Sequence, residues 1–280
     1  MLIFTDKTGQ LGNQLFEFGT FISNCRSSDT RLINLHFNSY KHYFEGPSEN
    51  YNSELKLRVS FGHRQADRIA RFLTVFISKN RWIRLGDWFR VLYSEGGSVN
   101  INLESFKNRI VFKNGSWFTD YPHFYEHQAA IKHYFRPLKE HRNNIAALIS
   151  DCRKEVDILV GIHIRRGDYK EFLNGVYYFE DSVFYEKMIQ IRDLNKDKKI
   201  GFLICSNEKV ETDLFKDVRF FRGTNHLVED MYSFAECDYI LGPPSTYTMW
   251  ASFYGNKPLL KLRDRQQIIK MEDFEMDYGY

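Results

Sequence analysis

Cysteine is scarce in this sequence, and the cysteines that occur lie far apart. The four thiols include no C-x-x-C pair and stand at Cys25, Cys152, Cys205 and Cys237. Neither a zinc knuckle nor a disulfide framework is therefore expected. Reduced thiols in a cytoplasmic protein are the simplest interpretation.

Two further features are missing. No apolar stretch approaches the roughly 18 residues that a membrane-spanning helix needs, and the opening MLIFTDKTG turns polar after four residues. We therefore expect neither a transmembrane helix nor a secretory signal. The sequence also lacks a large excess of charge of one sign. It has 39 Lys and Arg and 36 Asp and Glu, for a net charge of +3. This balance does not indicate a nucleic-acid-binding protein.

What the sequence does contain indicates a packed globular protein. Its 280 residues are 43% hydrophobic and 16% aromatic. A chain of this length is long enough for two compact domains, since single cores stop growing at about 250 to 300 residues.

The first half begins with the alternation of an α/β domain. The pattern predicts a strand at 2–4, a glycine-containing turn over TGQLGNQ, an amphipathic helix at 15–25 and a strand at 31–35. Further on, residues 64–88 combine apolar residues at helical spacing with many arginines, Trp82 and Trp88. This basic stretch indicates either peripheral contact with an anionic membrane or a helix packed on its own domain with a solvated basic face.

A second alternating series begins near residue 151. Strands are predicted at 157–164, 200–205, 239–241 and 258–262, and helices at 183–192, 229–237 and 245–254, the last one ended by Gly255. We expect an α/β protein with two domains, 1–150 and 151–280. Their boundary should fall in the charged stretch between Pro137 and Val156.

Polar groups follow three of the predicted strands of this second series. Arg165 and Arg166 follow the first, Ser206 and Asn207 the second, and residues 242–247 the third. In an open parallel sheet, ligands bind outside the carboxyl ends of the strands. Adjacent guanidinium groups fit phosphate oxygens, and a helix that begins at Ser245 would offer free N–H groups to an anion, so this rim predicts a diphosphate site.

Simpler interpretations of the same residues stay open. Paired arginines after a strand often form surface salt bridges, Ser245 can serve as an ordinary N-cap, and His163 can be a hydrogen-bonded core histidine.

The sequence resembles the bacterial type of α1,2-fucosyltransferase, within the group that includes α1,6- and protein O-fucosyltransferases. The H-x-R-R-x-D motif of that group matches residues 163–168, and Leu11-Gly12-Asn13-Gln14-Leu15-Phe16 matches a motif near the family's N-terminus. The family's D-L-Y-x-M-S-x-C segment corresponds to 230–237. The final N-S-S-F-S-W-W motif is only partly kept, in residues 242–252.

The resemblance implies a GT-B architecture, with two Rossmann-like domains facing a central cleft. The second domain would bind GDP-fucose, and the first would lie on the acceptor side. The implied reaction is an inverting transfer of L-fucose to a glycan hydroxyl, as in galactoside O2 (α1,2 linkage), during bacterial O-antigen or other surface polysaccharide synthesis. The acceptor would be a glycan, and the bacterial relatives imply that it is linked to a lipid. The enzyme would then work at the cytoplasmic face of the membrane.

By resemblance, the catalytic residues are Arg165, Arg166 and Asp168. The donor would be bound by His163, Arg165, Arg166, Ser206, Asp230, Ser245, Thr246 and Tyr247. Gly12, Asn13 and Gln14 would lie on the acceptor side. No metal is expected, because arginines can neutralise the leaving diphosphate and the sequence has no D-x-D motif.

The general base is left open by the sequence. Asp168 either takes the proton of the acceptor hydroxyl or orients Arg166. Glu17 is a further candidate, although a solvated position on its helix is the simpler interpretation.

Two other classes of protein are considered. His123, Glu126 and His127 spell H-x-x-E-H, the zinc-binding signature of a family of peptidases. A transferase fold that binds nucleotide or glycan without turnover is the other alternative.

Overall fold

The computed structural model divides the chain into two compact units, Met1–Leu138 and Lys139–Tyr280. It describes residues 2–4, 9–25, 32–34, 36–48, 51–52, 57–60, 72, 76, 89–94, 110–115 and 120–276. The division lies within the predicted stretch 137–156 but before residue 150. The reason is that helix α6 (Lys139–Arg153) packs on helix α8 (Leu227–Phe234) and so belongs to the second unit.

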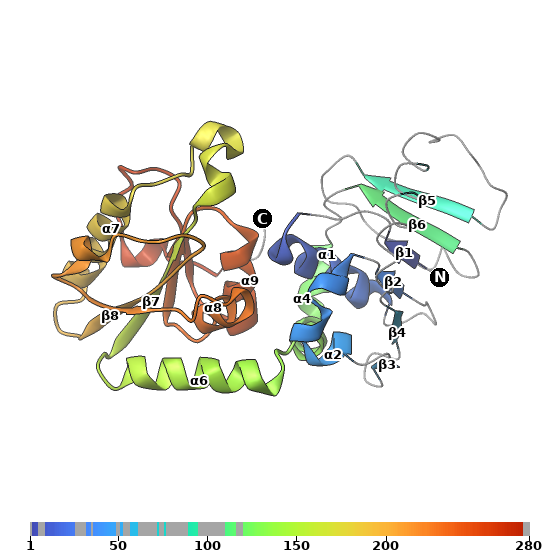
Figure 1. Ribbon diagram of the computed structural model, residues 1–280, viewed down its shortest axis with the longest axis horizontal. Helices are drawn as coiled ribbons and strands as arrows, with labels where there is room; N and C mark the ends of the chain where they lie inside the picture. The colour runs from blue at the N-terminus through green and yellow to red at the C-terminus, as the bar shows by residue number, and fades with distance from the viewer. Residues whose placement is uncertain are drawn as a thin grey trace. The chain divides into compact units, whose positions relative to one another are not determined.

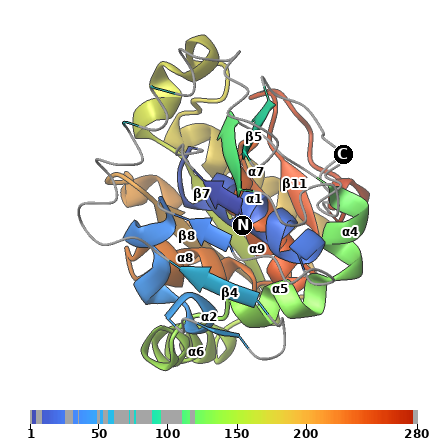
Figure 2. The same cartoon turned by 90° about the vertical axis from the view of Figure 1, so that its right-hand side faces the viewer.

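The first unit contains a six-stranded sheet (Figure 1 and Figure 2). Its order is β3 (Tyr51–Asn52), β4 (Leu57–Ser60), β2 (Leu32–Asn34), β1 (Leu2–Phe4), β6 (Ile110–Gly115), β5 (Phe89–Ser94). The pairs are parallel except for β3 with β4. The described helices are α1 (Leu11–Cys25), α2 (Glu45–Ser48), α4 (Tyr121–Glu126) and α5 (Gln128–Tyr134), with 3-10 turns at Phe37–Ser39 and Lys41–Tyr43.

Helix α1 begins four residues before the predicted start, which corrects the turn expected over TGQLGNQ. Gly9, with φ of 54°, makes the turn, and the Gln14 amide donates to the carbonyl of Gln10 (3.1 Å). Gly12, Asn13 and Gln14 therefore lie in the first turn of the helix rather than in a loop. The Gln14 side chain is buried and donates from Nε2 to the carbonyl of Gly9 (3.1 Å).

The described core of the first unit is aromatic and encloses an ion pair. Phe18 contacts the rings of Phe4, Phe37, Tyr134 and Phe135 at centroid distances of 5.2 to 6.0 Å. Next to this cluster, Lys113 Nζ lies 2.7 Å from Glu17 Oε1, and both side chains are buried. Glu17 is therefore not the solvated residue that the sequence suggested, and its carboxylate is held by a lysine.

The second unit is a doubly wound domain. Its parallel sheet has the order β11 (Leu259–Lys261), β10 (Tyr239–Gly242), β7 (Ile158–Ile164), β8 (Ile200–Ser206), β9 (Arg219–Arg222). Helices α7 (Asp181–Leu194), α8 and α9 (Thr246–Gly255) connect the strands, with 3-10 turns at Gly167–Lys170, Phe172–Gly175, Thr212–Phe215 and Met271–Asp273. The strand order reverses between β7 and β10, where such folds bind their ligands.

Side chains of β7 alternate between the two faces of this sheet. Val160, Ile162 and Ile164 belong to the same hydrophobic core as residues of α7. On the other face, a Cβ added to Gly161 would meet the Phe234 ring of α8 at 2.4 Å. The period of two therefore places His163 on the face that α8 and α9 cover.

Helix α9 does not end as predicted. Gly255 is its last helical residue, whereas the left-handed C-cap is Asn256, with φ of 51°. Gly255 is required for a different reason, since a Cβ there would lie 2.1 Å from the carbonyl oxygen of Ala235. The glycine allows α9 to approach the end of α8 closely.

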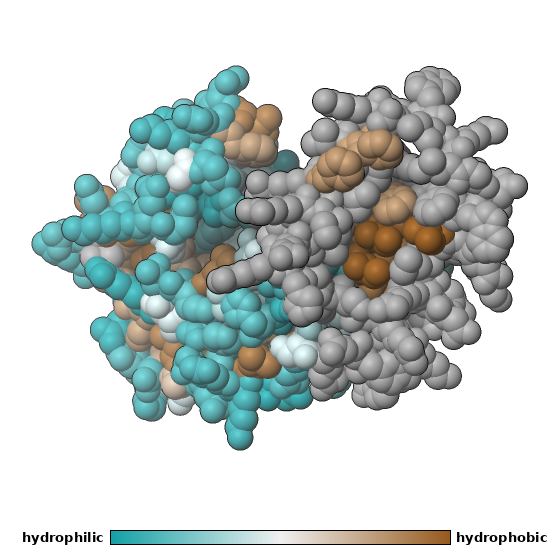
Figure 3. Space-filling view, turned by 45° about the vertical axis from the view of Figure 1, so that its right-hand side comes forward, coloured by the Kyte–Doolittle hydropathy of each residue, from teal (hydrophilic) through white to brown (hydrophobic). Residues whose placement is uncertain are grey.

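Few residues of the predicted membrane-contacting stretch belong to the described part of the chain. The expected stretch 64–88 lies outside the described residues except for Phe72 and Phe76, which are helical and exposed and whose rings stack at 6.1 Å. Within the described part of the chain, no helix has the length and apolar character to cross a bilayer. The second unit shows a mainly hydrophilic face with small separate apolar patches (Figure 3).

Candidate functional site

Two adjoining cavities lie at the carboxyl ends of β7 and β8. The first, of about 270 Å³, is lined by His163, Arg165, Cys205, Ser206, Asn207, Asn225, Leu227, Asp230 and Tyr247. The second, of about 440 Å³, shares Ser206, Asn207 and Asp230 with the first and extends to Arg222. The register of β7 and β8 explains why residues of both strands line the same cavity. His163 pairs with Cys205 and Ile164 with Ser206.

His163 is a neutral group in the wall of the first cavity. The residue is only 4% exposed, and its ring stacks on that of Tyr247 at 4.9 Å. Burial, and then the neighbouring charge of Arg165, lower the pKa of the imidazole to about 3. Its Nδ1 has no hydrogen-bond partner among the described residues. The expectation of a hydrogen-bonded core histidine is therefore not met at this atom.

Arg165 brings the positive charge to the first cavity. Its Nη2 donates to Asp168 Oδ1 (2.5 Å), and its guanidinium carbon lies 5.3 Å from the centroid of the Tyr169 ring. The side chain of Asp168 is 54% exposed. Asp168 therefore orients Arg165, and not Arg166 as the sequence suggested.

Arg166 points away from both cavities into the second unit. Its Nη1 donates to the carbonyl of Phe179 and its Nη2 to Asp181 Oδ1, while the guanidinium lies over the Tyr178 ring. The side chain is 6% exposed. Arg166 therefore ties the end of β7 to the start of α7. Of the predicted pair, Arg165 alone lines a described cavity.

Ser245, at the predicted start of the helix, is the N-cap of α9. Ser245 Oγ accepts from the amide of Tyr247 (3.2 Å), and Thr246 is the first residue of α9. Tyr247 is the member of this group that lines a cavity, and its hydroxyl donates to the carbonyl of Leu227 (2.8 Å). Burial raises the pKa of the Tyr247 phenol well above its usual value, so the group stays protonated.

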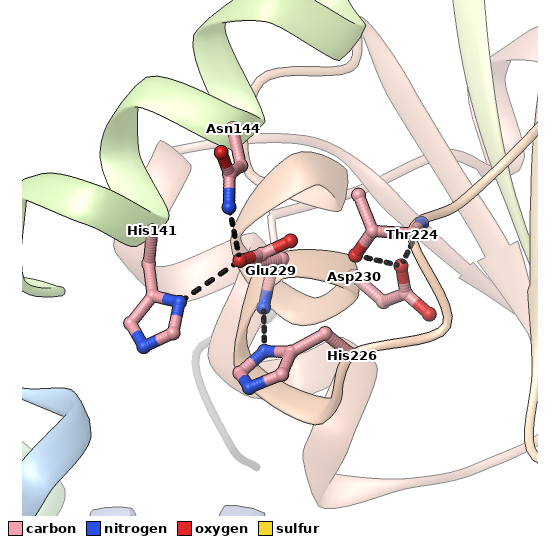
Figure 4. A network of polar contacts seen from close by, with 6 residues as sticks. All are labelled: His141, Asn144, Thr224, His226, Glu229 and Asp230. Carbon is pink, nitrogen blue, oxygen red and sulfur yellow. Dashed lines mark hydrogen bonds and ion pairs between the residues drawn. The ribbon is translucent and has the colours of Figure 1, made fainter.

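Asp230 places a buried carboxyl in the wall shared by the two cavities. Its Oδ1 accepts from the amide of Thr224 (2.8 Å) and faces the hydroxyl of the same residue (3.4 Å) (Figure 4). Burial raises the pKa of this carboxyl to about 6, although the bonds from Thr224 act in the opposite direction. Gly223 is needed here, since a Cβ would lie 2.4 Å from Asp230 Oδ1.

Several cavity residues escaped the sequence analysis as members of the site, among them Arg222, Asn225 and Leu227. Asn207 was expected at the rim as a residue after a strand, and its Oδ1 accepts from the amide of Arg166 (2.8 Å). Asn225 has φ of 61°, and Leu227 begins α8. Their positions depend on β9, an edge strand that the sequence did not predict.

The H-x-x-E-H sequence does not assemble a metal site. Helix α4 ends at Glu126, and His127 is its C-cap, so the two histidines are not on one continuous helical face. Their rings are 5.9 Å apart in an edge-on arrangement. Within the described ranges, the group of residues able to share an ion lies elsewhere, in the second unit.

Comparisons with known proteins agree with this architecture. A family model for glycosyl transferase family 11 matches residues 102–268. No curated protein matches the sequence significantly. Among solved structures, a point mutant of Arabidopsis thaliana FUT1 in complex with GDP superposes with a TM-score of 0.63 at 11% identity, over 94% of this chain and 71% of that one.

Two further solved structures are similar. The fucosyltransferase NodZ from Bradyrhizobium has a TM-score of 0.59 at 14% identity, over 96% of this chain and 97% of that one. POFUT1 in complex with GDP has a TM-score of 0.52 at 12% identity, over 92% and 97%. At these identities the likeness establishes a shared fold, the GT-B type of α/β architecture.

Proposed function

We propose that this chain, which belongs to glycosyl transferase family 11, transfers L-fucose from GDP-fucose to a hydroxyl of a glycan acceptor. The observation that carries the proposal is the grouping of Arg165, Asp230 and neutral His163 around one cavity at the strand-order reversal. A cation, a carboxyl group and an aromatic wall are what a nucleoside diphosphate requires. Similar structures that contain GDP or GDP-fucose support the choice of nucleotide.

Asp230 suits a guanine base. Guanine carries adjacent N1–H and N2–H donors on one edge, and a carboxylate accepts from both, whereas adenine has no such pair. Asp230 Oδ1 is held by Thr224, which fixes the orientation of the carboxyl group. This arrangement distinguishes GDP from ADP.

Arg165 suits the diphosphate. Its guanidinium is held in place by Asp168, so that it need not reorganise when the bond to fucose breaks. A positioned guanidinium stabilises the charge that develops on the leaving phosphate, which is the task of a metal ion in other sugar transferases. We infer that the transfer is metal-independent and inverting. Ser206, Ser245, Thr246 and Tyr247 complete the donor side of the proposal.

The remaining predicted residues position others or serve the acceptor side. Asp168 positions Arg165, and its alternative role is that of proton acceptor for the acceptor hydroxyl. Arg166 positions the end of β7 through Asp181. Gly12, Asn13 and Gln14 are proposed to serve the acceptor side, within the unit formed by residues 1–138.

The acceptor and the setting of the reaction are further parts of the proposal. Galactoside O2 is the acceptor atom that the resemblance favours, which gives an α1,2 linkage in bacterial O-antigen or surface polysaccharide synthesis. A lipid-linked acceptor would bring the protein to the cytoplasmic face of the membrane, where residues 64–88 would meet anionic lipid.

An acceptor panel tests the proposed function. Purified protein is incubated with GDP-fucose and a set of galactosides, and the product linkage is determined. We expect a fucosylated galactoside and stoichiometric GDP. Transfer from another nucleotide sugar, or peptide hydrolysis without transfer, would contradict the proposal; GDP-fucose binding without any turnover would identify a non-catalytic protein.

A further inference from the structure

Beside the candidate donor site, three side chains from two elements form a separate cluster. His141 lies in α6, His226 is the N-cap of α8, and Glu229 lies in the first turn of α8 (Figure 4). One ligand atom from each lies within 4.8 Å of the other two, which makes this the one group of its kind in the described part of the chain. All three residues belong to the second unit.

The chemistry of the cluster fits a cation. Glu229 is 5% exposed, and its described partners are His141, Asn144, Thr224 and His226, none of them a lysine or an arginine. Buried carboxylates in proteins are paired with charges or bind metal ions.

The rings of the two histidines lie against each other. Their rings stack with centroids 4.6 Å apart and planes at 22°. The ring nitrogens of imidazoles are ligands for a borderline metal ion.

We propose that His141, His226 and Glu229 bind one Zn²⁺ ion, which fastens α6 to the start of α8. Two nitrogen donors and one carboxylate are a ligand set of Zn²⁺, with water in the fourth position, and they disfavour Mg²⁺ and Ca²⁺. Bonds of about 2.0 to 2.2 Å place tetrahedral ligand atoms roughly 3.4 Å apart, so small side-chain rotations close the present spacing.

Two hydrogen bonds of the structure bear on how the ion is bound. His141 Nδ1 lies 2.9 Å from Glu229 Oε1, and the amide of Glu229 donates to His226 Nδ1 (3.3 Å). The ion takes the position between His141 Nδ1 and Glu229 Oε1, and the hydrogen displaced from Nδ1 moves to Nε2 of the same ring. Asn144 Nδ2 donates to Glu229 Oε1 (2.8 Å) and holds the carboxylate in place as a supporting residue.

The position of the site suggests what the ion does. Glu229 is followed directly by Asp230, and the segment that binds Asp230 through Thr224 leads into His226. An ion here fixes the start of α8 without touching the sugar donor. The role is structural, and the metal site does not rest on the proposed function.

The test uses metal binding by the intact protein and needs no activity. Chelator-treated protein is titrated with Co²⁺ and then with Zn²⁺. We expect one equivalent of Co²⁺ to give the intense visible bands of four-coordinate cobalt, and Zn²⁺ to abolish them. At about a hundredfold excess over its Kd, Zn²⁺ should raise Tm by about 5 °C or more.

Variants locate the ion. His141→Gln and Glu229→Gln should remove the cobalt bands, and Asn144→Ala should weaken binding by about 10- to 100-fold. The matched control is the double variant His123→Gln/His127→Gln, which removes a histidine pair of the first unit and should bind as the unmodified protein does.

Two results would overturn the proposal. One is an unmodified protein that binds no stoichiometric Zn²⁺. The other is binding that survives in the folded His141 and Glu229 variants but is lost in the control. If those two variants do not fold, anomalous diffraction at the zinc edge from crystals of the unmodified protein decides whether an ion lies between these residues.

Discussion

Adjacent residues of one motif have separate tasks in this protein. Arg165 and Arg166 follow each other at the end of β7, yet the first lines a cavity and the second is buried against Phe179 and Asp181. Partners that lie 13 and 15 residues further along the chain determine this difference. Substitutions at the two positions should therefore affect different properties.

Replacement of Arg165 should affect the chemistry. Arg165→Ala removes the proposed diphosphate clamp and should lower kcat by about 10²- to 10³-fold with little change in Tm. Arg165→Lys keeps the charge but loses the planar fork, so an intermediate rate is expected. Fucosyl transfer rates and thermal melts of the two variants check this. Full activity in Arg165→Ala would contradict it.

Replacement of Arg166 should affect stability first. Arg166→Ala leaves the carboxylate of Asp181, 11% exposed, with the amide of Glu211 but without its cation, and should cost about 3 kcal/mol in the free energy of unfolding. Denaturant titration measures the cost, and Arg166→Ala/Asp181→Ala should recover part of it. A stable variant with weakened GDP binding would instead place Arg166 on the diphosphate.

The carboxyl of Asp230 should determine the base. Asp230→Asn keeps the shape and one acceptor but offers a donor where guanine also offers donors. We expect GDP binding to weaken by about 1 to 3 kcal/mol and the preference for GDP over ADP to fall. Calorimetric titration with both nucleotides measures the change. An unaltered preference would place the guanine elsewhere.

His163 should make the fold sensitive to acid. Its folded pKa of about 3 lies below the unfolded value of 6.5, so between these values the unfolded chain binds more protons. Stability should therefore fall as the pH drops from 6.5 to 5, by up to about 2 kcal/mol from this residue. His163→Gln should show a shallower fall in denaturant titrations at both pH values. An equal fall in both proteins would contradict the buried, neutral state.

At the scale of elements, helices α8 and α9 pack closely because Gly255 has no side chain. Gly255→Ala would place a methyl group against the carbonyl of Ala235 and should cost about 1 to 3 kcal/mol. Asn256→Gly relieves a left-handed residue one position later and should be neutral or slightly stabilising. Thermal melts of this matched pair separate packing from backbone conformation. A neutral Gly255→Ala would show that the helices can move apart.

The elements that the sequence predicted correctly are the ones with strong local signals. Strands β7 and β8 are buried apolar runs that end in polar residues, and α9 follows an N-cap serine. Strand β9 has exposed arginines at both ends around two half-buried phenylalanines, so it carries no alternating pattern. The start of α1 was missed because its glycine and amides are typical of turns, whereas in the structure the Gln14 side chain donates to the carbonyl of Gly9.

The parts of the site that were missed depend on distant residues. Asp230 and Arg165 were found because each belongs to a local motif. The contact between His141 and Glu229 joins residues 88 positions apart, and no local pattern relates them. Conversely, H-x-x-E-H has the spacing of a metal motif, but the end of α4 at Glu126 separates its histidines.

At the scale of the whole molecule, two α/β units are combined in a glycosyl transferase of family 11. The family match confirms the predicted family, and the α1,2 type stays a prediction. Sugar transfer should not need a metal ion. We expect the initial rate of fucosyl transfer to be unchanged by EDTA when measured well below Tm, even if the chelator lowers Tm by emptying the proposed zinc site. A rate that disappears with EDTA and returns with Mg²⁺ or Mn²⁺ would contradict an arginine-based mechanism.

A crystal structure of the protein with GDP tests the central claim most directly. We predict that the guanine edge lies within hydrogen-bond distance of the Asp230 carboxyl and that the β-phosphate contacts the Arg165 guanidinium. GDP bound away from both residues, or with its phosphates on a site that excludes Arg165, would contradict the account.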